Sequence, residues 1–195
     1  GTLKDYRAFV HRDTGPAKLV VCPVDAAYWK NLIMPTPIEM AKLGVKYGGL
    51  DGVLIDGELY GPLNARPAIS VSFYMDVGPC MCDHCFGDFL TQMRGKEKWA
   101  DIPWKDRYVW LQKRKLTRDY NARLRDNVAA LARQLEQQVH AVNPDLLLGL
   151  MNWYKNEIGA GPHENYFLHG LRNGLKTSKR PVMVWTEGPE YEQGY

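Results

Sequence analysis

The chain lacks any apolar run near the roughly 20 residues that a membrane-spanning helix needs. It also lacks a Gly-x-Ser-x-Gly elbow, a Walker phosphate-binding loop and a Gly-x-Gly-x-x-Gly fingerprint. These absences argue against a membrane protein, an α/β-hydrolase, a P-loop nucleotide hydrolase and a Rossmann dehydrogenase. No secretory signal is visible, but the chain begins with Gly1-Thr2 rather than Met, so the earlier removal of a signal peptide stays open.

The chain also lacks a large excess of charge of either sign. The chain has 25 Lys and Arg residues against 22 Asp and Glu residues, a formal net charge of +3. Most basic residues fall between Lys105 and Arg133, interleaved with carboxylates, which predicts a solvated helix face rather than a nucleic-acid surface. With 195 residues, of which 45% are hydrophobic, the composition is that of one globular domain, residues 1–195. We expect no nucleic-acid or membrane partner, and oligomerisation stays open.

There are four cysteines, and three of them lie within the six residues Cys-Met-Cys-Asp-His-Cys at 80–85. Such close thiols are poorly placed to form disulfides with one another, but they suit a soft, tetrahedral metal ion. The sequence therefore predicts a structural zinc ion bound by Cys22, Cys80, Cys82 and Cys85, which would bring residue 22 close to residues 80–85. A site with His84 in place of Cys22, disulfides to Cys22, and buried thiols are the alternatives. Zinc thiolates are more typical of a reducing, cytoplasmic compartment.

Strand and helix patterns alternate along the chain. The apolar runs 18–22, 52–55, 146–151 and 181–185 predict strands. Helices are predicted at 36–47, with Thr36 as N-cap, at 86–93, at 116–142 and at 166–175, and a new segment begins at Pro103-Trp104. The longest helix is the clearest, because its apolar residues recur at steps of three and four until Asn143-Pro144 ends it. Continuous apolar strands that alternate with helices predict a parallel sheet covered by helices.

Several of these strands end in polar and aromatic residues. In a (β/α)8 barrel the active site lies at the carboxyl ends of the strands. Only about four strands are visible, whereas a full barrel needs roughly 250 residues. The predicted fold class is therefore α/β of the (β/α)8 TIM-barrel type, as a partial barrel of about four strand–helix units and a fragment of a longer protein. An open doubly wound sheet is the alternative.

Two glutamates after predicted strands are candidate catalytic residues. Glu58 follows the strand at 52–55, with Asp56 two residues earlier, and residues two apart on a strand face the same way. Two adjacent carboxylates repel each other and favour a shared proton, as a general acid requires. A carboxylate that caps a loop or pairs with Arg66 is the alternative. Glu187 follows the strand at 181–185, where an exposed polar loop is the alternative.

Aromatic residues lie beside these carboxylates in the sequence. A sugar needs an apolar surface for its ring and hydrogen-bonding groups for its hydroxyls, so this combination predicts a carbohydrate site. The candidate substrate-binding residues are Asp56, Trp29, Asn152, Trp153, Trp185 and Tyr191. A role in the hydrophobic core is the alternative for Trp153.

Three motifs, taken in order, resemble the family forty-two glycoside hydrolases, zinc-containing β-galactosidases with a (β/α)8 barrel. The motifs are Cys22-Pro23 with Ala27-Tyr28-Trp29, then Asp56-Gly57-Glu58-Leu59-Tyr60-Gly61, then Cys80-x-Cys82-x-x-Cys85 followed by Phe86 and Phe89-Leu90. The resemblance covers about residues 18–93. It implies that the four cysteines are the zinc ligands and that Glu58 is the general acid/base of a retaining glycosidase. The strands would then be roughly the third to the sixth of the barrel.

The chain departs from the family pattern at two positions. Gly57 stands where the family has the asparagine that holds the sugar 2-hydroxyl, and Leu59 is an extra residue before the tyrosine. These differences indicate a divergent relative. The family's nucleophile lies at the end of the seventh strand, so it is either Glu187 or a residue beyond Tyr195.

The sequence thus predicts a glycoside hydrolase-like domain that binds a carbohydrate at the strand ends. A non-catalytic carbohydrate-binding or structural barrel domain with a structural zinc is the alternative. A zinc-ribbon nucleic-acid module fits less well, because its cysteines come as two short pairs with basic residues near them.

Overall fold

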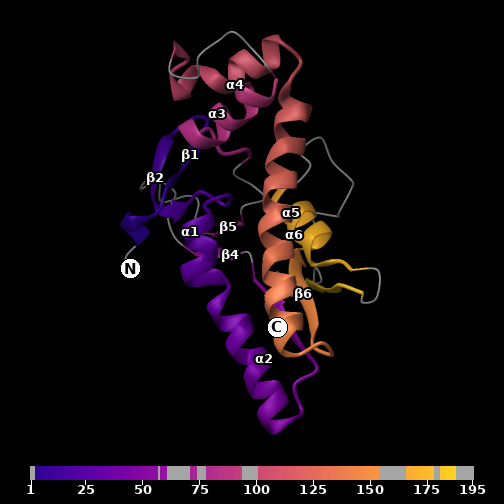
Figure 1. Ribbon diagram of the computed structural model, residues 1–195. Helices are drawn as coiled ribbons and strands as arrows, with labels where there is room; N and C mark the ends of the chain where they lie inside the picture. The colour runs from indigo at the N-terminus through magenta and orange to yellow at the C-terminus, as the bar shows by residue number, and fades with distance from the viewer. Residues whose placement is uncertain are drawn as a thin grey trace.

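The computed structural model describes residues 3–56, 58–60, 71–73, 78–93, 101–153, 166–177 and 181–187. Its elements are a 3-10 turn (Leu3–Asp5), β1 (Ala8–His11), β2 (Gly15–Val21), α1 (Ala26–Tyr28), a π-helical turn (Trp29–Ile33), α2 (Pro35–Tyr47), β3 (Gly52–Ile55), β4 (Glu58–Tyr60), β5 (Val71–Phe73), α3 (Asp83–Gln92), α4 (Trp104–Lys113), α5 (Thr117–Val142), β6 (Leu147–Trp153), α6 (Tyr166–Leu175) and β7 (Met183–Glu187). Figure 1 shows α5 running the length of the molecule, with α3 and α4 near one end and α2 and β6 towards the other.

The apolar face of α5 forms the centre of the core, as the spacing predicts. Its buried residues include Tyr120, Leu124, Val128, Leu131, Leu135 and Val139. Helix α6 packs closely on this helix, because Gly170 and Gly174 place no side chain between the two backbones. A Cβ at Gly170 would lie 2.6 Å from the Arg125 carbonyl oxygen of α5. Within the described ranges, no helix has both the length and the apolar character of a membrane span.

Three of the predicted strands form one parallel sheet in the order β3-β6-β7. Leu148 and Leu150 of the central strand are buried in the core formed with the helices. Leu54 of β3 and Trp185 of β7 remain 40% and 59% exposed. The sheet is therefore well covered on the helix side and open to solvent around its edge strands. The described strands do not close a barrel, so the partial barrel stays a prediction.

The first predicted strand does not belong to this sheet. Residues 15–21 form β2, which pairs antiparallel with β1, and the sequence reading missed β1. Gly15 begins β2 with a φ of +80°, which glycine adopts freely and other residues adopt only with strain. The hairpin places Cys22 directly after β2, at the end of the molecule where α3 lies. An antiparallel hairpin thus replaces the first of the four predicted strand–helix units.

Two local predictions are also wrong. Helix α2 begins at Pro35 and continues from the preceding π-helical turn, so Thr36 lies inside its first turn rather than capping it. A proline is tolerated at the first helical position because its missing N–H would have no helical partner there. Asp56 and Glu58 do not share a strand, because β3 ends at Ile55 and Glu58 begins β4, which pairs antiparallel with β5.

Candidate metal centre

The four cysteines converge from two distant parts of the chain. Their sulfur atoms all lie within 4.8 Å of one another, and all four residues are buried. The Cys22 Sγ is 3.4 Å from the Cys85 Sγ and 3.8 Å from the Cys82 Sγ. A disulfide requires about 2.05 Å between the sulfurs, whereas four thiolates at ~2.3 Å around a tetrahedral ion are roughly 3.8 Å apart. This group, the cysteine cluster, therefore matches a site that can bind a metal ion.

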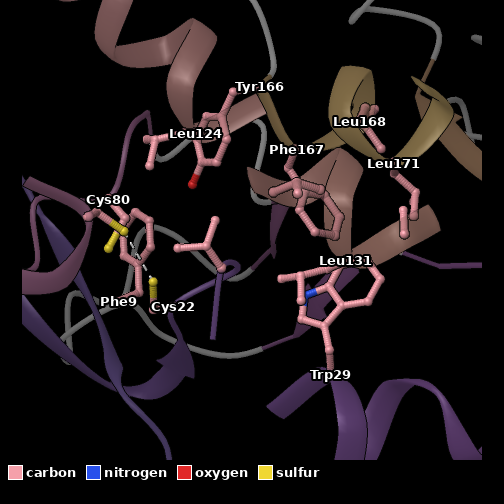
Figure 2. Close-up of a cluster of buried hydrophobic side chains, with 14 of the residues drawn as sticks. Phe9, Cys22, Trp29, Cys80, Leu124, Leu131, Tyr166, Phe167, Leu168 and Leu171 are labelled. Carbon is pink, nitrogen blue, oxygen red and sulfur yellow. Dashed lines mark hydrogen bonds between the residues drawn. The ribbon is translucent and has the colours of Figure 1, made fainter. Parts of the chain in front are cut away.

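Backbone hydrogen bonds hold the two cysteine-bearing segments together. The Met81 N–H donates to the Val10 carbonyl at 2.8 Å, and the Val10 N–H points to the Cys80 sulfur at 3.4 Å. On the other segment, the Cys22 N–H donates to the Arg7 carbonyl at 2.7 Å. Strand β1 and the residues just before it thus contact both segments. Figure 2 shows Cys22 and Cys80 with Phe9 and Leu124 in the hydrophobic core.

Helix α3 begins inside the cluster. Cys82 is its N-cap, and the Cys82 sulfur accepts from the Cys85 N–H at 3.5 Å. The free N–H groups and the dipole of a helix N-terminus favour negative charge, so this position stabilises a thiolate. The N-cap role of Cys82 was not predicted from the sequence, although a helix that begins directly after Cys-x-Cys indicates it.

The crowding of the thiols has an electrostatic consequence. Hydrogen bonding with Cys80, and then with Cys82, raises the pKa of Cys22, and contact with Cys22 raises the pKa of Cys85. The pKa of Cys82 is lowered, first through its hydrogen bond with Cys22. Without a cation, burial beside other thiols thus disfavours the thiolate forms of Cys22 and Cys85. A divalent cation would remove the repulsion and hold all four as thiolates, since a coordinated thiol is deprotonated.

Four protein ligands fill a tetrahedral site. Catalytic zinc sites keep one position for water or substrate, whereas structural sites do not. The most exposed member of the cluster, Cys82, is only 7% exposed. The alternative with His84 as a ligand does not hold, because Cys22 occupies the fourth position and His84 is exposed beside Asp88 and Asn127. The cluster suits a role in stability rather than in chemistry.

The carboxyl ends of β3, β6 and β7 meet at one edge of the parallel sheet, which we call the strand-end edge. Trp153 pairs in register with Glu187, and Asn152 with Thr186. Asp56 follows β3 at the same edge and is exposed. The backbone thus places three of the predicted polar positions, Asp56, Asn152 and Glu187, along one edge.

The structure separates the remaining candidates. Trp185 is exposed near this edge, whereas Trp29 is completely buried and its indole N–H donates to the Pro23 carbonyl at 2.8 Å. Trp29 therefore offers no open ring face to a sugar and belongs to the core beside Cys22. The backbone of Glu58 lies in β4, and its side chain is outside the described part, as are those of Asn152, Trp153 and Glu187. Tyr191 lies outside the described residues altogether.

Comparison with known proteins adds no relative. No protein-family model matches the chain, and no curated protein and no solved structure matches it either.

Proposed function

We propose that the cysteine cluster holds a structural zinc ion. The sulfur spacing carries this proposal, because it fits a tetrahedral ion at ordinary zinc–sulfur distances and is too long for disulfides. Zinc fits better than an iron–sulfur cluster, since no other feature of the chain suggests redox chemistry. The ion would cross-link the β1–β2 hairpin to the N-terminus of α3.

Metal analysis of the purified chain tests this proposal. We expect about one equivalent of zinc, and a Cys85→Ser chain that loses the metal and much of its cooperative unfolding transition. Zinc-thiolate sites contribute on the order of 10 kcal/mol in small domains, comparable to the total stability of a domain, about 5–15 kcal/mol. Met81→Leu is the matched control, because Met81 is fully buried within the same loop but supplies no ligand. A metal-free wild-type chain with a normal unfolding transition would contradict the proposal.

We also propose that the chain is a glycoside hydrolase-like α/β domain, a partial barrel that acts at the strand-end edge. The parallel order β3-β6-β7 supports this, because it brings Asp56, Asn152 and Glu187 to one edge with the exposed Trp185 nearby. The catalytic carboxyl groups would have to lie ~5–5.5 Å apart in a retaining enzyme and ~6.5–9.5 Å apart in an inverting one.

The roles follow from the chemistry of glycoside cleavage. Glu58 would protonate the leaving glycosidic oxygen, and a second carboxylate, for which Glu187 is the candidate, would form or stabilise the glycosyl intermediate. Trp185 would stack on a sugar ring, and Asp56 and Asn152 would bind hydroxyl groups.

A Glu58→Gln chain assayed on a panel of aryl glycosides tests these roles. The substitution removes the acid but keeps the side-chain shape, so we expect hydrolysis to fall by about 10²- to 10⁴-fold. The control is Glu39→Gln, because Glu39 is an exposed residue of α2 that pairs with Lys42. Unchanged hydrolysis in the Glu58 variant of an active protein would contradict the assignment.

A non-catalytic carbohydrate-binding domain is the second candidate. The observation that favours it is the position of Glu58, which begins the separate β4–β5 hairpin instead of ending a strand of the parallel sheet. Glycan binding without hydrolysis would support this candidate, and binding of nucleic acid in the same assay would instead support a zinc-ribbon module.

A further inference from the structure

One arginine of the basic segment is buried against the cysteine loop (residues 80–85). Arg107 of α4 is 3% exposed, although it belongs to the segment that the sequence assigns to solvent. Its guanidinium donates to the Met81 carbonyl at 2.6 Å, to the Ile102 carbonyl at 2.9 Å and to the Asp83 carboxylate at 2.7 Å. The same group lies over the ring of Phe86, 5.2 Å from its centroid. Burying a charge without partners would be costly. The three oriented acceptors therefore indicate that the fold specifically accommodates this side chain.

We propose that Arg107 is the positioning residue of the metal site, an inference that rests on the proposed zinc. Met81 lies between the ligands Cys80 and Cys82, and Asp83 directly follows Cys82. By binding the Met81 carbonyl and the Asp83 carboxylate, the guanidinium restrains the chain on either side of Cys82. Only a planar, forked donor can reach acceptors in several directions from one helix position.

Charge gives this contact a second effect. Four thiolates around a divalent ion leave two net negative charges in a buried site. The buried guanidinium offsets part of that charge, because the Asp83 carboxylate that pairs with it is 65% exposed and is screened by solvent. Tyr120 complements this role, because its hydroxyl donates to the Cys80 carbonyl without adding charge.

The chain contains a matched control. Arg123 of α5 also joins a neighbouring helix to α3 through an aspartate, with donors 2.7 and 3.0 Å from the Asp88 carboxylate oxygens. Asp88 lies three residues beyond Cys85, outside the cysteine loop. Each arginine thus forms an ion pair with α3, but only Arg107 also contacts the loop that carries the cysteines.

The experiment measures zinc release from the full chain to a chromophoric chelator for wild type, Arg107→Met, Arg107→Lys and Arg123→Met. Loss of an outer-shell partner weakens metal binding by about 10- to 100-fold, so we expect release from Arg107→Met to accelerate by a factor in that range. Arg107→Lys keeps the charge without the fork and should fall between Arg107→Met and wild type. Arg123→Met should stay within about threefold of wild type, since its arginine does not touch the loop. With cobalt in place of zinc, Arg107→Met should also shift the thiolate-to-cobalt absorption bands, which a general loss of stability would not do.

Equal acceleration in the Arg107→Met and Arg123→Met chains, with an unchanged cobalt spectrum, would overturn the inference and leave the zinc site standing. If Arg107→Met does not fold, Arg107→Lys carries the test: faster release supports the inference, and wild-type release and spectrum overturn it. A wild-type chain that binds no zinc or cobalt would instead overturn the proposed metal site itself.

Discussion

The cysteine cluster and the strand-end edge are built in opposite ways. In the cluster, four sulfurs are buried and lie within 4.8 Å of one another, and backbone N–H groups point at Cys80 and Cys82. At the strand-end edge, Asp56 is exposed and Trp185 is 59% exposed. The first region has its ligand positions filled by the protein, and the second leaves polar and aromatic groups accessible to a solute.

This difference separates stability from chemistry. A metal ion with four protein ligands has no position for a substrate, so the cluster is suited to cross-linking the hairpin to α3. The carboxyl ends of parallel strands are where α/β proteins bind their ligands. Metal removal should therefore act on folding, whereas substitutions at the edge should act on ligand binding.

The largest expected contrast lies between two tryptophans, one from each region. Trp29→Ala removes a fully buried indole and its hydrogen bond to the Pro23 carbonyl, so we expect a loss of about 3–5 kcal/mol in the free energy of unfolding. Trp185→Ala removes an exposed ring and should change this free energy by less than about 0.5 kcal/mol. Denaturant titration measures both values.

The same pair tests the sugar site. Trp185→Ala should weaken carbohydrate binding by about tenfold, which corresponds to ~1.4 kcal/mol, and calorimetric titration with oligosaccharides measures the change. A large stability loss in Trp185→Ala with unchanged binding would show that the exposed edge is structural, and the contrast between the regions would fail.

The sequence predicted the cluster better than it predicted the edge. Thiol spacing is a local chemical signal, and the contact between Cys22 and residues 80–85 followed from the metal site that such spacing predicts. The α5 face was equally clear, because 26 residues of periodicity leave little ambiguity. The strands at 52–55, 146–151 and 181–185 were also recognisable as parallel strands, although the two outer ones are less buried than their apolar runs predict.

The sequence pattern did not show which strands pair with one another. The run at 18–22 has the composition of a parallel strand, but its partner β1 is only four residues long and carries little signal. Arg107 was misjudged for a related reason. Nothing local distinguishes it from its solvated neighbours, and its burial depends on a loop 26 residues earlier in the chain.

A second prediction concerns the packing that supports the strand-end edge. Helices α5 and α6 meet closely at Gly174, where an added Cβ would collide with the Ala129 carbonyl and the Ala132 side chain. Gly174→Ala should therefore cost about 1–3 kcal/mol despite the better helix propensity of alanine. Gly44→Ala in α2 is the control, because its Cβ would come closest to the Asn143 side chain, at 3.1 Å, which can move, and would meet Leu50 at ordinary contact distances of 3.4 and 3.6 Å. Thermal unfolding compares the two variants. Equal unfolding temperatures would show that α5 and α6 can move apart without loss of stability.

The smallest expected effect is on acid stability near the cluster. Hydrogen bonds from Arg123, and then from Asn127, lower the pKa of Asp88 below its usual value. A carboxyl whose pKa is lower in the folded chain adds stability above its unfolded pKa of about 3.9, and this stability is lost as the pH falls through the folded pKa.

Asp88→Asn should therefore be less stable than wild type at pH 7, by at most about 1 kcal/mol because solvent screens this half-buried pair. The difference should shrink below about pH 4, as wild-type Asp88 is protonated. Urea titrations from pH 2 to pH 7 measure it, with the exposed Asp126→Asn as a control. A constant difference down to pH 2 would mean that the amide perturbs packing and that the ion pair adds nothing. With the proposed zinc bound, the acid sensitivity of this region would then rest on the cysteines, whose protonation would release the metal ion.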